Sequence, residues 1–106
     1  GTPASAVRAA KLQLPLMLAI IGGRPEQFVP FIQLYRDTTK KEGHDEKNIQ
    51  LGVNNHFYVS ENSQTAGKEF YPYYSEMMTR IGRERGWPPL SHEQYEYLRS
   101  EKGALM

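Results

Sequence analysis

A short apolar segment closed by two glycines constrains the fold of this chain more than any other feature. Residues 16–21 are apolar without interruption, and Gly22 and Gly23 follow them directly. This pattern is typical of a strand that is buried on both faces of a parallel sheet. A buried helix gives a similar run, but helices are usually longer, so the length favours a strand.

Residues 49–59 predict a second strand because their side chains alternate in character. One face would carry Leu51, Val53, Phe57 and Val59, and the other would carry Gly52, Asn54, His56 and Tyr58. The second face becomes polar toward its end. We therefore expect Asn54 and His56 at the carboxyl end of this strand.

Two helices are predicted around the first strand. Thr2 can cap a helix over residues 3–12, and Pro3 suits its first turn. Pro25 opens a second helix, over residues 25–41, and Pro30 is expected to kink it. The apolar face of this helix would consist of Phe28, Phe31, Ile32 and Tyr35.

The last part of the chain predicts a long helix and a short one. The long helix covers residues 63–85, although Gly67 and Pro72 weaken its first half. Its apolar stripe would consist of Ala66, Phe70, Tyr74, Met77 and Ile81. Ser91 and Gln94 form a capping box for a short helix that runs through Leu98.

The predicted order is therefore helix, strand, helix, strand, helix, helix, which indicates an α/β fold with two parallel strands. Two strands cannot cover their own edges or bury both faces. A complete (β/α)8 barrel needs about 250 residues. We expect residues 1–106 to form one internal part of such a barrel rather than a complete domain.

Composition excludes several classes of protein. The chain is 39 % apolar and 24 % charged, has a net charge of +1 and contains no cysteine. The charge balance gives no reason to expect nucleic acid or an anionic membrane as a partner, and no disulfide or cysteine-ligated metal can form. No apolar run approaches the roughly 20 residues that span a bilayer. We expect a cytoplasmic protein without a signal peptide.

Five segments spread along the chain resemble a branch of the luciferase-like monooxygenase family, and the likeness extends over essentially the whole chain. They are LPLMLAIIGGRP (residues 14–25), FIQLYR (31–36), GVNNH (52–56), FYPYYSEMM (70–78) and RIGRERGWP (80–88). The resemblance implies a (β/α)8 barrel that binds reduced FMN or, in some relatives, the deazaflavin F420. Members that use FMN add one atom of O₂ to an organic substrate.

The resemblance also assigns places in the barrel. The chain would run from the helix after strand five to the helix after strand seven, so the isolated chain should be inactive. A separate flavin reductase and a homodimer are implied as partners, as in many relatives. Two residues depart from the family pattern, because relatives commonly carry glycine at the position of Gln13 and a better helix former at that of Gly67.

The start of the first helix is a candidate phosphate site. Gly1, Thr2 and Ser5 combine small residues and hydroxyls with a helix N-terminus, whose backbone N–H groups favour anions. The alternative is a plain helix cap. The resemblance favours phosphate, since relatives use a turn rich in glycine, serine and threonine here.

Three further candidates follow the first strand. Gly22 and Gly23 permit a ligand to approach the backbone, and Arg24 can bind a phosphate or carboxylate with its guanidinium fork. The carboxyl ends of barrel strands build the active site. The alternative is a tight turn followed by a solvated arginine.

Asn54 and His56 are the candidate catalytic residues. If the apolar face of their strand packs under the helices, both side chains point into the mouth of the barrel, where they can hydrogen-bond flavin or substrate and His56 can exchange a proton. The alternative is a buried polar layer whose hydrogen bonds are satisfied. The three histidines are too scattered for a metal site, so we expect none.

Two groups in the long helix favour structural roles. The stripe of Tyr71, Tyr73, Tyr74, Met77 and Met78 indicates core more than a substrate pocket. The charged residues Arg80, Arg83, Glu84 and Arg85 indicate a solvated face.

Overall fold

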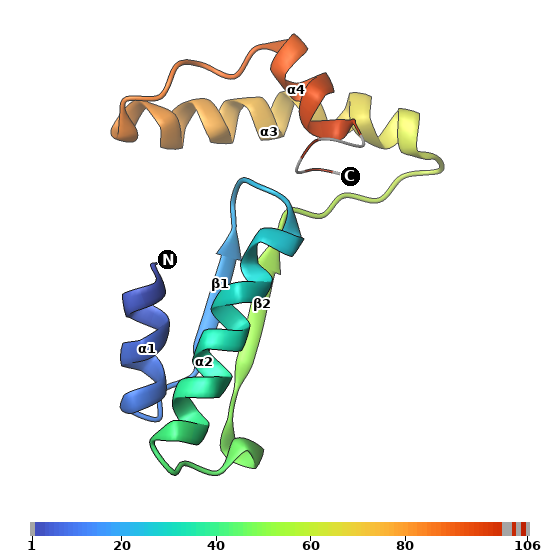
Figure 1. The fold of residues 1–106 in the computed structure, drawn as a ribbon. Helices are drawn as coiled ribbons and strands as arrows, with labels where there is room; N and C mark the ends of the chain where they lie inside the picture. The colour runs from blue at the N-terminus through green and yellow to red at the C-terminus, as the bar shows by residue number, and fades with distance from the viewer. Residues whose placement is uncertain (1, 101–102, 104, 106) are drawn as a thin grey trace. The chain divides into compact units, whose positions relative to one another are not determined.

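The computed structural model of the chain describes residues 2–100, 103 and 105. Within these residues it is an α/β structure with four α-helices, two short 3-10 helices and two parallel strands (Figure 1). The elements are α1 (Pro3–Lys11), β1 (Leu16–Ile20), η1 (Pro25–Phe28), α2 (Val29–Lys41), η2 (Glu46–Asn48), β2 (Leu51–Asn55), α3 (Ser63–Arg85) and α4 (His92–Arg99). The chain divides into an amino-terminal unit, Gly1–His56, and a carboxy-terminal unit, Phe57–Met106.

The amino-terminal unit is a parallel strand–helix–strand arrangement preceded by α1. β1 and β2 pair in parallel with Leu16 opposite Leu51 and Ile20 opposite Asn55, which confirms the predicted parallel pair. Both helices cover the same face of the sheet, because their buried residues form one cluster with Leu16 and Leu51. The hydroxyl of Tyr35 in α2 donates a hydrogen bond of 2.8 Å to the carbonyl of Leu14. This bond joins α2 to the residues that lead into β1.

The opposite face of the sheet is open. Leu18 and Ile20 are buried on the helix side, whereas Met17 is 67 % exposed. The prediction that this strand is buried on both faces is therefore wrong for the described residues. The physical reason is that one layer of helices covers only one face of a two-stranded sheet.

Pro30 does not kink a continuous helix, contrary to the prediction. The segment is divided into the 3-10 helix Pro25–Phe28 and the α-helix Val29–Lys41. Pro30 thereby lies in the first turn of α2, where a missing backbone N–H breaks no hydrogen bond within the helix.

The second strand is shorter than predicted. It covers Leu51–Asn55 rather than residues 49–59. The carboxamide oxygen of Asn55 accepts a hydrogen bond of 2.8 Å from the backbone N–H of His56. After Asn55 the chain leaves the sheet, and Phe57 is 84 % exposed. His56 therefore follows the strand instead of belonging to it.

Two helices joined by a loop make up most of the carboxy-terminal unit. α3 has the predicted bounds, because Asn62 caps its first turn and Gly86 ends it in the left-handed conformation. α4 begins with the predicted capping box, in which Ser91 and Gln94 bond reciprocally. Tyr74 and Tyr95 are the largest fully buried side chains among the described residues. They form the core between the two helices.

Gly67 has a packing role that the sequence did not reveal. Its carbonyl accepts a hydrogen bond of 2.8 Å from the buried hydroxyl of Tyr95. The guanidinium of Arg99 occupies the space that a side chain at position 67 would need, and it bonds the carbonyl of Ser63 at 3.1 Å. Glycine therefore allows α4 to approach α3 closely.

Candidate functional site

The carboxyl end of the β1–β2 sheet brings the predicted site residues to one end of the amino-terminal unit. Because the strands are parallel and Ile20 lies opposite Asn55, the turn after β1 and the residue after β2 lie at the same edge. α1 runs antiparallel to β1, so its first turn also lies toward this end (Figure 1). We call this region the carboxyl-edge site.

The start of α1 contributes two hydroxyl groups. The Thr2 hydroxyl accepts a hydrogen bond from the backbone N–H of Ser5 at 3.3 Å and lies 3.0 Å from the Ser5 hydroxyl. Both residues are exposed, and the first turn contains no acidic side chain. The predicted helix cap is therefore present, and nothing in the first turn would repel an anion. Gly1 lies outside the described residues.

The turn after β1 contains Gly22, Gly23 and Arg24, as predicted. Gly23 has a φ of 85°, a left-handed conformation that glycine adopts without strain. A side chain at Gly22 would meet no atom within 4 Å, so the backbone there is accessible. The Arg24 Nε lies 3.4 Å from Glu26 Oε2 in an exposed ion pair. Such pairs are weak, so the terminal amino groups of Arg24 can face an anion.

The end of β2 contributes Asn54 and His56. Asn54 lies in the strand opposite Ala19, is exposed, and has no side-chain hydrogen bond within the described residues. His56 is half-buried just beyond the strand. Sequence reasoning missed the part played by Asn55, whose side chain holds the backbone at this point.

Sequence reasoning also missed the other residues on the open face of the sheet. By register, Met17 lies opposite Gly52 and Ala19 opposite Asn54. A Cβ at Gly52 would lie 2.8 Å from Met17 Sδ, so the Met17 side chain extends across β2 on this face. Exposed Met17 and Ala19 alternate with buried Leu18 and Ile20 along β1. The sequence does not reveal this alternation, because all four residues are apolar.

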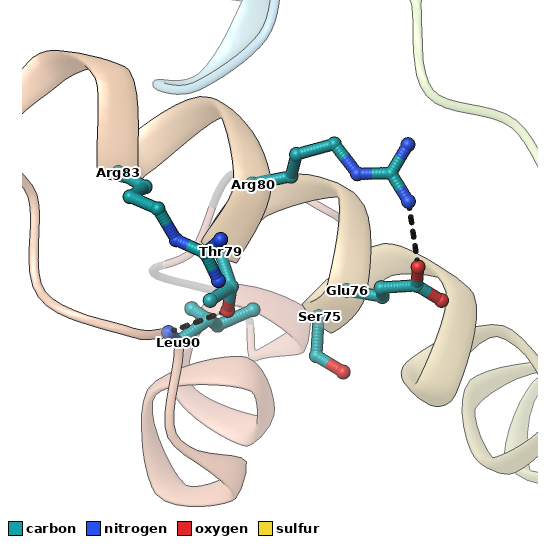
Figure 2. A pocket seen from close by; sticks show the side chains of 6 residues that line it. All are labelled: Ser75, Glu76, Thr79, Arg80, Arg83 and Leu90. Carbon is teal, nitrogen blue, oxygen red and sulfur yellow. Dashed lines mark hydrogen bonds and ion pairs between the residues drawn. The ribbon is translucent and has the colours of Figure 1, made fainter.

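A separate groove lies along α3 in the carboxy-terminal unit (Figure 2). It has a volume of about 390 Å³ and is lined by Ser75, Glu76, Thr79, Arg80, Arg83 and Leu90. Arg80 forms an ion pair of 2.7 Å with Glu76, and these side chains are 74 % and 70 % exposed. The Thr79 hydroxyl oxygen accepts a hydrogen bond of 3.4 Å from the backbone N–H of Leu90. The groove is thus wide and solvated, in agreement with the predicted charged face.

Aromatic side chains of the carboxy-terminal unit pack rather than form a pocket. The rings of Tyr74 and Tyr95 lie 5.8 Å apart, and burial raises the pKa of both hydroxyl groups. Tyr58 donates a hydrogen bond of 3.0 Å to Glu69, and this bond to a carboxylate raises the pKa of Tyr58. The interpretation of the aromatic stripe as core agrees with the structure at Tyr74, whereas Tyr73 is exposed.

Neither a candidate metal cluster nor a membrane-crossing helix occurs among the described residues. Across residues 2–100, 103 and 105, no three histidine, aspartate or glutamate side chains gather as a metal site would require. Over the same residues, no helix combines the length and apolar character needed to cross a bilayer.

No protein-family model matches this chain, and no curated protein matches it. The resemblance to luciferase-like monooxygenases therefore remains a prediction from the residues.

Proposed function

We propose that this chain is part of a flavin-dependent monooxygenase of the luciferase-like class, with β1 and β2 as neighbouring strands of a (β/α)8 barrel. The carboxyl-edge site carries the proposal. It gathers two hydroxyls, a glycine turn, an arginine, an asparagine and a histidine at the end of parallel strands where such barrels build their active sites.

The one-sided covering of the sheet supports the barrel. In a barrel the helices lie outside and the inner face of the sheet is closed by the remaining strands. Here α1 and α2 share the outer face, and Met17 is exposed on the other. A two-stranded sheet with an open face has little stability alone. Further strands would bury this face and pair both edges.

The residues at the carboxyl-edge site fit FMN. Its phosphate suits the N-terminus of α1, where Thr2 and Ser5 provide hydroxyls and no acidic residue intervenes. Arg24 provides a positive charge. Asn54 can donate and accept hydrogen bonds, which a ring with carbonyl and N–H groups requires. We assign Thr2, Ser5, Gly22, Gly23 and Arg24 to cofactor binding.

Asn54 and His56 are assigned to the reaction itself. Bound as reduced FMN, the cofactor would supply electrons for the transfer of one atom of O₂ to an organic substrate. The role of Asn54 is to orient the ring or substrate by hydrogen bonds. The imidazole of His56 can hold or transfer a proton through its two ring nitrogens. Apolar side chains from the rest of the barrel would line the site and exclude water.

The test uses the full-length protein that contains this chain. FMN and F420 are titrated separately, and O₂ consumption is followed with reduced FMN supplied by a flavin reductase. We expect FMN to bind and O₂ to be consumed with a suitable organic substrate. We expect Asn54→Ala and His56→Ala to lower turnover, and Asn48→Ala, at the opposite end of the sheet, to leave it unchanged. Reduction of F420 by substrate without O₂ would contradict the monooxygenase proposal.

A second candidate function is a non-catalytic module that associates with itself through its open sheet. The exposed Met17 and the unpaired strand edges favour this candidate. Light scattering of the 106-residue chain tests it. A monodisperse oligomer that melts cooperatively would support self-association, whereas a marginally stable monomer would support a part of a barrel.

A further inference from the structure

We propose that Ala19 makes room for the flavin ring between Met17 and Asn54 on the open face of the sheet. This inference rests on the proposed function. It assigns a positioning role to a residue whose side chain has no polar group.

Side chains on the open face form two successive rows. Met17 and Gly52 are in register in the first row, nearer the amino end of the strands. Ala19 and Asn54 are in register in the second row, nearer the carboxyl end. Residues two apart on a strand lie on the same face, so a ligand entering at the carboxyl end meets the second row first.

A single side chain fills the first row. The position that a Cβ would take on Gly52 lies 2.8 Å from Met17 Sδ, so the thioether of Met17 lies over the glycine. The absence of a side chain at Gly52 is what permits this position. Met17 thereby forms an apolar floor that extends over both strands, and thioethers make favourable contacts with aromatic rings.

The second row leaves space above this floor. Ala19 provides only a methyl group, whereas bulky branched residues dominate the interior rows of such barrels. Asn54, its partner in register, provides one hydrogen-bond donor group and one acceptor. A flat ring with a polar edge can therefore lie over the alanine, contact the thioether and bond the carboxamide. Isoalloxazine has this shape and such an edge.

The test is the dissociation constant of FMN from the full-length protein, measured by fluorescence quenching, together with the flavin absorption spectrum. We expect Ala19→Leu to raise the dissociation constant about tenfold or more, because the larger side chain takes the space of the ring. Ala19→Val, which suits a strand better, should give a smaller rise in the same direction. Asn48→Ala, at the opposite end of the sheet and outside the proposed site, is the control and should leave the FMN affinity unchanged.

A double variant separates loss of space from general damage. In the double variant, Met17→Ala is combined with Ala19→Leu. The shorter side chain at position 17 gives the leucine room to move away from the ring, so part of the lost FMN affinity should return. Unchanged FMN affinity in folded Ala19→Leu and Ala19→Val overturns this inference and leaves the proposed function standing. If the unsubstituted protein binds no flavin, the proposed function fails and the inference fails with it.

Discussion

The α3–α4 interface and the carboxyl-edge site use their polar side chains in different ways. In the carboxy-terminal unit, Tyr95 and Arg99 bond to the backbone of α3, and Ser91 caps α4. At the carboxyl-edge site, Asn54 has no side-chain hydrogen bond within the described residues, and Arg24 forms an exposed ion pair. The polar groups of the α3–α4 interface hold the two helices together, whereas Asn54 and Arg24 are available to a ligand. This difference is why we propose the carboxyl-edge site as the place of the chemistry.

The largest expected effect concerns the core of the carboxy-terminal unit. Tyr74 is 2 % exposed, so Tyr74→Ala should lower the free energy of unfolding by about 3–5 kcal/mol through loss of burial and creation of a cavity. Tyr73→Ala, at an exposed neighbouring position, should change it by less than about 0.5 kcal/mol. Denaturation in urea measures both. Equal losses in the two variants would show that Tyr74 is not the core of this unit.

The next effect isolates one buried hydrogen bond. Tyr95→Phe removes the hydroxyl that donates to the Gly67 carbonyl, and we expect a loss of about 1–2 kcal/mol because a buried hydrogen bond between α4 and α3 is lost. Tyr97→Phe is the matched control, since Tyr97 is exposed on the same helix. Amide hydrogen exchange should show faster opening of α3 around Gly67 in the first variant only. Equal stability and equal exchange in the two variants would show that this hydrogen bond does not stabilise the unit.

The carboxy-terminal unit also shows which features a sequence reveals. The bounds of α3 and the capping box of α4 were predictable because caps are local and involve residues three apart. The packing role of Gly67 could not be predicted, because it depends on contact with Arg99, which is distant in the sequence. A contact of that kind leaves no periodic signal.

Prediction was less complete in the amino-terminal unit. The parallel pairing and the gathering of residues after both strands followed from the order of elements. The end of β2 could not be predicted, because the alternation of side chains continues past Asn55 although the strand ends there. The role of Met17 over Gly52 also required coordinates, since the register of two strands decides which side chains meet.

The smallest expected effect concerns a strained residue before β1. Gln13 has a φ of 56°, a conformation that costs a residue with a side chain more than it costs glycine. Gln13→Gly should therefore stabilise the amino-terminal unit by about 0.5–1 kcal/mol. Gln13→Ala keeps the strain and should give no gain. Thermal unfolding compares the two, and equal stability in both would show that backbone strain at this position is negligible.

We propose that the end of the β1–β2 sheet binds flavin, and titration of the full-length protein with FMN decides whether it does. We expect binding that Asn54→Ala weakens about tenfold, the effect of losing a well-made hydrogen bond. The same variant should keep its thermal stability, and Asn48→Ala, at the opposite end of the sheet, should bind FMN unchanged. Absence of FMN binding, or equal affinity in the unsubstituted protein and both variants, would show that this end of the sheet is not the flavin site.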